Sequence, residues 1–248
     1  MGDKISIVVP VFNAGGCIAD TINSCLGQDH EDLELLLVDD GSVDDSVSVM
    51  EGFASEHVKI LKNANEKGAA GARNTGIDAA TGRYVAFIDA DDLWAKDKLS
   101  KQVAFMKERD AAFSFTGYEF ADETGRGLGK IVRVPETITY KEALKNTTIF
   151  TSTVMFDMEK LSKDDIRMPY VKSEDTATWW KVLKKTGKAY GLDESLALYR
   201  RMSDTLSSDK FEAIRRIWNL YRRQEKLGLI YSMYCFCFWA LRAVARRV

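Results

Sequence analysis

The chain has 248 residues, of which 46% are hydrophobic and 29% are charged, and its formal net charge is −2. This balance supports a sizeable core and excludes wholesale disorder, and the slight negative charge argues against a nucleic-acid partner. The charge is unevenly spread: residues 210–248 hold nine Lys/Arg against two Asp/Glu, a net +7, which leaves −9 on the first 209 residues. A basic tail on an acidic body predicts that the tail has a binding partner of its own.

The first half of the chain alternates apolar runs with helical patterns. We predict strands at 5–12, 33–38, 58–61 and 84–88, and helices at 17–28, 44–56, 69–80 and 94–109. Buried strands separated by helices are typical of an α/β fold with a mostly parallel central sheet and helices on both faces.

The second half has a mixed pattern. We predict strands at 112–120 and 131–134, a further apolar run at 149–156, and helices at 176–185, 211–226 and 229–245. The last two helices predict a helical extension. The expected domains are therefore a catalytic body at 1–208 and a basic, aromatic tail at 209–248.

The cysteines and histidines favour neither a disulfide framework nor a zinc site. None of the four cysteines forms a C-x-x-C motif, and the chain has only two histidines. The amino terminus is short and β-branched, unlike a signal peptide, so we expect a cytoplasmic body.

Polar residues follow three of the predicted strands, where open parallel sheets bind their ligands. They occupy residues 10–13, 39–42 and 89–92. The third run places Asp89, Asp91 and Asp92 within four residues, and crowded carboxylates need a compensating cation. An oxygen-rich cluster of this kind suits Mg²⁺ or Mn²⁺. Taken alone, residues 39–42 are explained equally well by a turn that caps the next helix and by a ligand site.

Five segments, in order, resemble a family 2 glycosyltransferase of the bacterial surface-polysaccharide type. They are VVPVFN at 8–13, VDDGSVDDS at 38–46, NEKGAAGARNTG at 65–76, FIDADD at 87–92 and ED at 174–175. The resemblance covers residues 4 to about 208 and implies the Rossmann-like GT-A fold. It also implies an inverting, metal-dependent transfer of one sugar from a UDP-sugar to a hydroxyl of a saccharide acceptor.

The resemblance assigns roles on the donor side. The ring of Phe12 would pack near the base, and the carboxylate of Asp40 would accept the ring N–H of the base. Asp91 would contact ribose or metal, and Asp91 or Asp92 would hold Mn²⁺ or Mg²⁺ on the diphosphate. The other residues expected to bind the nucleotide are Pro10, Asn13, Lys67, Arg73 and Asp89.

The resemblance also implies one general base, because inverting members use direct displacement. Asp175 is the expected base, and its neighbour Glu174 is the second candidate. Arg200 or Arg201 would neutralise the diphosphate, or both are ordinary surface arginines. Many relatives carry a metal-binding histidine where this chain has Met202, which puts a third protein ligand in doubt.

The tail is rich in arginine and aromatic residues, and its uncharged stretch, 227–241, is shorter than the roughly 20 residues of a membrane span. It predicts an amphipathic surface at residues 211–247 that binds the inner face of the cell membrane. The acceptor would then be linked to a polyprenyl diphosphate. The alternative is a tail that packs on the body or dimerises.

Two other functions compete with transfer. A catalytically silent scaffold that binds a nucleotide-sugar would have no physical need to keep Asp91 and Asp175. A nucleotidyltransferase would need a basic, glycine-rich N-terminal loop, and no Lys or Arg lies near Gly15 and Gly16.

Overall fold

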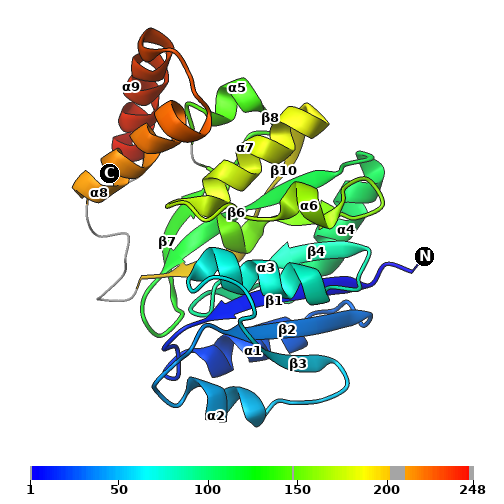
Figure 1. The fold of residues 1–248 in the computed structure, drawn as a ribbon. Coiled ribbons are helices and arrows are strands. Elements are labelled where there is room, and N and C mark those ends of the chain that lie inside the picture. The colour runs from blue at the N-terminus through cyan, green and yellow to red at the C-terminus, as the bar shows by residue number, and fades with distance from the viewer. Residues whose placement is uncertain (1, 147, 202–209, 246–248) are drawn as a thin grey trace.

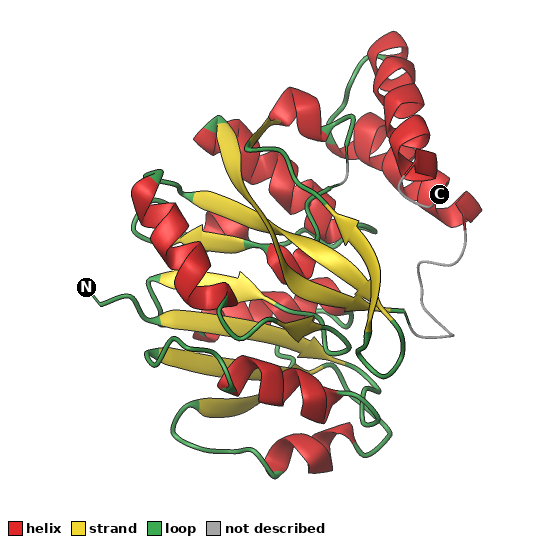
Figure 2. Cartoon of the chain, turned by 180° about the vertical axis from the view of Figure 1, so that it is seen from behind, coloured by secondary structure: helices red, strands yellow, loops and turns green. Residues whose placement is uncertain are grey.

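A computed structural model describes residues 2–146, 148–201 and 210–245 (Figure 1). One ten-stranded sheet runs through these residues in the order β3-β2-β1-β4-β9-β6-β10-β5, with β7 paired to β6 and β8 paired to β10. Helices cover both faces of this sheet, as the view from behind also shows (Figure 2). The predicted α/β class is therefore confirmed.

The amino-terminal part of the sheet is parallel. Strands β3, β2, β1 and β4 are neighbours and all pair in parallel. The elements here are β1 (Ile5–Val11), α1 (Ile18–Leu26), β2 (Leu33–Asp39), α2 (Ser46–Glu51), β3 (Val58–Lys62), α3 (Ala69–Ala79) and β4 (Tyr84–Phe87). Each predicted element is present, although α2 is shorter than the predicted helix at 44–56.

The rest of the sheet is mixed, so the predicted parallel character holds only for the first half. Strand β9 runs antiparallel to both β4 and β6, and β10 pairs in parallel with β6. The elements here are β5 (Leu93–Trp94), α4 (Lys98–Glu108), β6 (Phe113–Ala121), β7 (Gly127–Val132), β8 (Thr137–Thr139), α5 (Tyr140–Ala143), β9 (Met155–Asp157), α6 (Lys163–Ile166), α7 (Glu174–Thr186) and β10 (Lys188–Arg200).

One helix in this part was predicted with the wrong start, and two features were not assigned from the sequence. The helix expected from residue 94 begins at Lys98, because Leu93–Trp94 pairs with β10 as a short strand. The apolar run 149–156 is a strand only from Met155 onward, and Thr151–Thr153 forms a 3₁₀ turn. Strand β10 was missed, because polar residues and two register shifts interrupt its apolar alternation.

Apolar cores lie on both faces of the sheet. Ile5, Ile7 and Val9 of β1 join the cluster that includes residues of α1 and α4. Val8 joins the cluster on the other side, with Trp179 of α7. Because β1 is buried on both faces, its sequence is a continuous apolar run rather than an alternating one.

The tail consists of α8 (Lys210–Asn219), a π-helical turn (Leu220–Gln224) and α9 (Leu229–Ala245). One side of it packs on the body: the Tyr221 ring stacks on Trp180 with centroids 5.5 Å apart. Ile217, Leu220 and Cys235 are buried in the same cluster. The predicted domain boundary at residue 208 and the terminal Arg246 and Arg247 lie outside the described residues. Among the described helices, none combines the length and the apolar character needed to cross a bilayer.

Candidate active site at the carboxyl edge of the sheet

The polar runs after β1, β2 and β4 meet at one edge of the sheet. The three strands are parallel neighbours, and the register pairs Val11 with Asp39. The backbone N–H of Ile88 donates to the carbonyl of Val8 at 3.2 Å, which continues this pairing to the start of the Asp89 run. The carboxyl ends of the strands therefore bring the predicted site residues together, as expected for this sheet type.

Two of these runs are tied together by local hydrogen bonds. Asn13, at the exit of β1, has a positive φ of 50°. Its backbone N–H donates to the Ser42 hydroxyl at 3.1 Å, and its side-chain oxygen accepts the N–H of Val43 at 2.9 Å. Asp39 accepts the N–H of Ser42 at 2.9 Å. Asn13 and Asp39 thus fix the loop that carries Asp40.

Asp40 anchors a second loop to the first. Its side chain accepts from Asn63 Nδ2 at 2.6 Å and from the backbone N–H of Gly68 at 2.8 Å, and the residue is 9% exposed. Gly68 has a φ of 121°, which glycine adopts without strain, and it directly precedes α3. A carboxylate has about four acceptor positions, so capacity remains for a ligand N–H.

An aromatic ring and a cation stand beside this loop. Phe12 is 51% exposed, and Lys67 Nζ lies 5.1 Å from the centroid of its ring. An exposed ring with a cation over it offers a face on which a planar base can stack. Pro10, also expected to bind the nucleotide, is half-buried within β1.

Arg73 of α3 joins two acidic parts of the site. Its guanidinium donates to Asp89 Oδ1 at 2.6 Å and to Glu174 Oε1 at 2.7 Å. The side chain is buried, and these two carboxylates raise the pKa of Arg73 further although burial opposes them. The sequence predicts contact between Arg73 and the nucleotide. In the structure, its two ion pairs join the end of β4 to the start of α7.

Asp91 and Asp92 are adjacent in sequence but lie in different environments. Asp91 is half-buried, and burial together with the charge of Asp89 raises the pKa of Asp91 to about 6. Asp92 is fully buried: the Ser152 hydroxyl donates to one carboxylate oxygen, and the backbone N–H of Arg200 donates to the other at 3.2 Å. Burial raises the pKa of Asp92 well above its usual range. Its oxygens serve the interior, so only Asp91 is kept as a candidate metal ligand.

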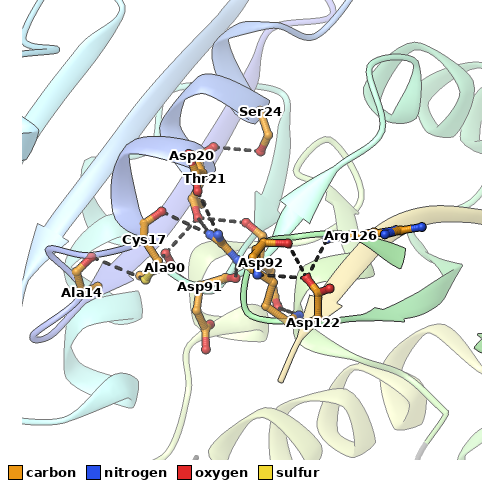
Figure 3. Close-up of polar contacts among 12 residues, drawn as sticks. Ala14, Cys17, Asp20, Thr21, Ser24, Ala90, Asp91, Asp92, Asp122 and Arg126 are labelled. Atoms are coloured by element: carbon orange, nitrogen blue, oxygen red, sulfur yellow. Dashed lines mark hydrogen bonds and ion pairs between the residues drawn. The ribbon is translucent and has the colours of Figure 1, made fainter. Parts of the chain in front are cut away.

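Arg200 was expected to neutralise the diphosphate or to be an ordinary surface arginine, and its position fits neither expectation. Its side chain is buried and donates to Asp20 Oδ2 at 2.9 Å and to the carbonyl of Cys17 at 3.1 Å. Figure 3 shows Cys17, Asp20 and Asp92 in one set of polar contacts. Arg200 is thus neither a surface residue nor free to meet a diphosphate. Arg201 is exposed, with its guanidinium 4.1 Å from the centroid of the Phe120 ring.

The two candidate bases open α7, directly after Ser173, which has a φ of 60°. Asp175 accepts from the Thr151 hydroxyl at 3.3 Å and from the Thr176 N–H at 2.6 Å, and no cation pairs with it among the described residues. Burial raises the pKa of Glu174, although its ion pair with Arg73 opposes this shift. Asp175 is therefore the more available of the two carboxylates.

The donor atoms fit a divalent cation only if a ligand supplies part of the coordination. The described residues hold no group of three or more His, Cys, Asp or Glu side chains that could bind a metal ion. In that part of the chain no side-chain hydrogen bond or ion pair reaches the Asp91 carboxylate, and Asp89 lies nearby as a like charge. A hard cation shared with diphosphate oxygens suits this environment. Met202 lies outside the described residues.

Comparisons with known proteins identify the family. The family model "Glycosyl transferase family 2" matches residues 6–163. The chain belongs to this family. It is 42% identical over 247 residues to a Bacillus subtilis protein named as the teichuronic acid biosynthesis glycosyltransferase TuaG, covering 98% of this chain and 97% of the relative. It is also 36% identical over 217 residues to the Escherichia coli protein named UDP-Glc:alpha-D-GlcNAc-diphosphoundecaprenol beta-1,3-glucosyltransferase WfgD, covering 87% and 84%. The chain is a glycosyltransferase.

Solved structures share the predicted GT-A fold. S. aureus TarS 1-349 in complex with UDP-GlcNAc superposes with a TM-score of 0.72 and 22% identity, covering 96% of this chain and 71% of that one. The Pyrobaculum calidifontis mannosyltransferase PcManGT, in complex with GDP-Man and Mn²⁺, has a TM-score of 0.70 and 18% identity, covering 98% and 70%.

Several residues that shape this glycosyltransferase site were missed from the sequence. Ser152 donates to Asp92 and accepts the N–H of Asp89 at 3.0 Å. Asn63 donates a hydrogen bond to Asp40, and Asp20 accepts one from Arg200. The hydroxyl triplet Thr151–Thr153 inside an apolar run was a usable signal, since such a run seldom contains three polar residues without a local role. Nothing in the sequence marks Asn63 or Asp20.

Proposed function

We propose that this glycosyltransferase transfers one sugar, with inversion, from a UDP-sugar to a hydroxyl of a lipid-linked saccharide in the synthesis of a cell-surface polysaccharide. The observation that carries the proposal is the convergence of Phe12, Asp40, Asp91 and Asp175 on one edge of a GT-A sheet. The names of TuaG and WfgD and the UDP-GlcNAc complex of TarS support the donor and acceptor classes.

The donor base would lie against Phe12, with its ring N–H donated to Asp40. Two bonds already fix the Asp40 carboxylate, so its orientation is set before the nucleotide arrives. Lys67 would add charge-assisted contact at the rim. A base with an acceptor in place of that N–H would leave Asp40 facing a lone pair, which favours uracil over cytosine.

Asp91 would hold Mn²⁺ or Mg²⁺. When bound, the cation withdraws charge from the diphosphate leaving group. Asp89 is kept in place by two bonds: Arg73 donates to its carboxylate, and its backbone N–H donates to the Ser152 hydroxyl. Exposed Arg201 is the remaining candidate for direct contact with the diphosphate.

Asp175 would take the proton from the acceptor hydroxyl as that oxygen attacks the anomeric carbon. Thr151 and the N–H of Thr176 hold its carboxylate at the start of α7. A single base is sufficient for direct displacement, and the product has inverted configuration because attack and departure occur on opposite faces.

The tail would place the enzyme on the inner face of the cell membrane. Helix α9 carries an exposed row of apolar side chains at helical spacing, with Ile230 85% and Leu241 69% exposed. The row consists of Ile230, Met233, Tyr234, Phe238 and Leu241. Lys145 lies over the rings of Tyr234 and Phe238, at 5.6 and 6.0 Å. Apolar and aromatic groups beside cations suit an anionic lipid surface.

Calorimetric titration of UDP into the full chain, with and without Mn²⁺ and with GDP as the control, tests the donor assignment. We expect binding that requires Mn²⁺ and prefers UDP. If neither nucleotide binds under any metal condition, the assignment of a UDP-sugar donor fails.

A further inference from the structure

A small basic pocket lies where the tail meets the loop before α7. Its volume is about 220 Å³, and its wall combines Val171 and Lys172 of the loop with Arg216, Asn219, Arg223 and Gln224 of the tail. Pockets for whole small molecules usually measure roughly 300–1,000 Å³, so this one suits a group smaller than a nucleotide.

The pocket carries more positive than negative charge. Lys172 and Arg216 both bond to Glu212, the latter with 3.4 Å between Nε and Oε1. Arg223 has no acidic partner in the part of the chain that the structure describes. Three cations against one carboxylate leave a surplus of two positive charges, and the amides of Asn219 and Gln224 add neutral donors.

The pocket also lies close to the candidate base along the chain. Lys172 precedes Asp175 by three residues, so their Cα atoms are at most about 11 Å apart. The donor side of the site, in contrast, is built from the ends of β1, β2 and β4. A ligand in the pocket would therefore approach the reacting hydroxyl from the side of the tail.

We propose that this pocket binds the diphosphate of the lipid-linked acceptor. A diphosphate esterified at both ends carries one negative charge on each phosphate, which matches the surplus. Arginine forks bind phosphate oxygens through paired N–H donors. The sugar on one side of the diphosphate would reach toward Asp175, and the prenyl chain on the other would follow the tail to the membrane. This inference rests on the proposed function, because it specifies the acceptor of that same reaction.

The test is calorimetric binding of a geranyl-diphosphate-linked sugar, whose diphosphate is esterified at both ends, to the full chain, with EDTA present so that no metal holds the probe at the donor site. Arg223→Gln removes the cation that has no acidic partner in the described chain. Arg215→Gln is the matched control, since Arg215 is exposed on α8 and does not line the pocket. We expect Arg223→Gln to weaken binding by roughly tenfold or more, and Arg215→Gln to leave it within twofold.

In the probe titration, three results would overturn the proposal: no binding to the wild-type chain, equal effects of the two variants, or displacement of the probe by UDP. Vesicles containing phosphatidylglycerol separate the acceptor from an ordinary lipid headgroup. If Arg223→Gln weakens vesicle binding as strongly as it weakens probe binding, the pocket is a headgroup site and the acceptor assignment falls. Mn²⁺-dependent UDP binding, measured on the same Arg223→Gln protein, shows independently whether the donor chemistry stands.

Discussion

The carboxyl edge of the sheet and the C-terminal tail depart from ordinary protein surfaces in opposite ways. At the edge, charged side chains are buried: Arg73 and Asp92 are almost fully enclosed. On the tail, apolar side chains are exposed, with Ile230 and Leu241 mostly open to solvent. Charged residues are seldom buried unless paired, and large exposed apolar patches usually mark an interaction site.

The difference shows how each region would meet its partner. Burial at the edge holds carboxylates in fixed positions before a ligand arrives, so binding reorganises little. Exposure on α9 leaves apolar surface whose burial in lipid would supply the attraction, with little need for fixed geometry. Substitutions at the edge should therefore change catalysis or folding, whereas substitutions on the outer face of α9 should change location alone.

The largest effect is expected at the base. Asp175→Asn keeps the shape of the side chain but removes its ability to take a proton, so kcat should fall by about 10²–10⁴. The affinity for UDP should not change, because Asp175 would contact the acceptor hydroxyl rather than the nucleotide. Steady-state kinetics and UDP titration on the same preparation measure both quantities.

Glu174→Gln is the control for that substitution. Glu174 is held by Arg73, so its loss should also disturb the junction between β4 and α7. If Asp175→Asn stays fully active while Glu174→Gln loses turnover with normal stability, then Glu174 is the base.

Arg73→Met should produce the next largest effect, on stability. Without the guanidinium, Asp89 and Glu174 lose their shared cation in a buried position, and breaking such a pair costs about 3–5 kcal/mol. Urea unfolding at pH 7 measures the loss of unfolding free energy. Arg73→Lys, which keeps the charge but not the two-armed contact, should recover part of it. Wild-type stability in Arg73→Met would mean that another group already neutralises the two carboxylates.

The sequence predicted the parallel half of the fold well, because each signal there is local. Continuous apolar runs such as 33–38 are typical of strands covered on both faces, and polar residues directly after them point to the ligand edge. Phe12 and Asp40 could be located at that edge from strand order alone.

The remaining features depend on contacts between distant residues. Asp91 and Asp92 look equivalent in the sequence, and only the meeting of Ser152 and Arg200 around Asp92 separates them. Arg200 looks like a surface arginine because its partners lie about 180 residues earlier, on α1. Strand β10 was missed because its pairing with β6 tolerates two irregularities that remove the strand periodicity.

A double substitution on α9, Ile230→Ser with Leu241→Ser, tests the other half of the comparison. It removes two exposed apolar side chains that make no core contact, so sedimentation with anionic vesicles should fall by roughly tenfold to a hundredfold. Thermal unfolding and turnover on a soluble acceptor should not change. Leu26→Ser, at an exposed position on α1, is the control and should keep vesicle binding. Equal loss in both proteins would show that the α9 row is not a membrane surface.

The smallest expected effect is a pH dependence of donor binding. A carboxyl binds a cation only when it is deprotonated, and the pKa of Asp91 is raised to about 6. Below pH 6, each further unit should therefore weaken Mn²⁺-dependent binding of UDP-glucose by up to about tenfold. UDP-glucose is preferred to UDP, because a diphosphate esterified at both ends has no group that titrates near pH 6.

The same shift has a definite sign in folding. Between the ordinary value of 3.8 and about 6, the folded chain holds a proton that the unfolded chain has released. The contribution of Asp91 to the free energy of unfolding therefore falls as pH rises through this window. Above pH 6, adding Mn²⁺ with UDP-glucose should restore the lost free energy of unfolding. Asp91→Asn should abolish both this pH dependence and the stabilisation by Mn²⁺. If binding weakens only below about pH 4, Asp91 does not coordinate the cation. Another carboxylate at this edge would then have to be the metal ligand.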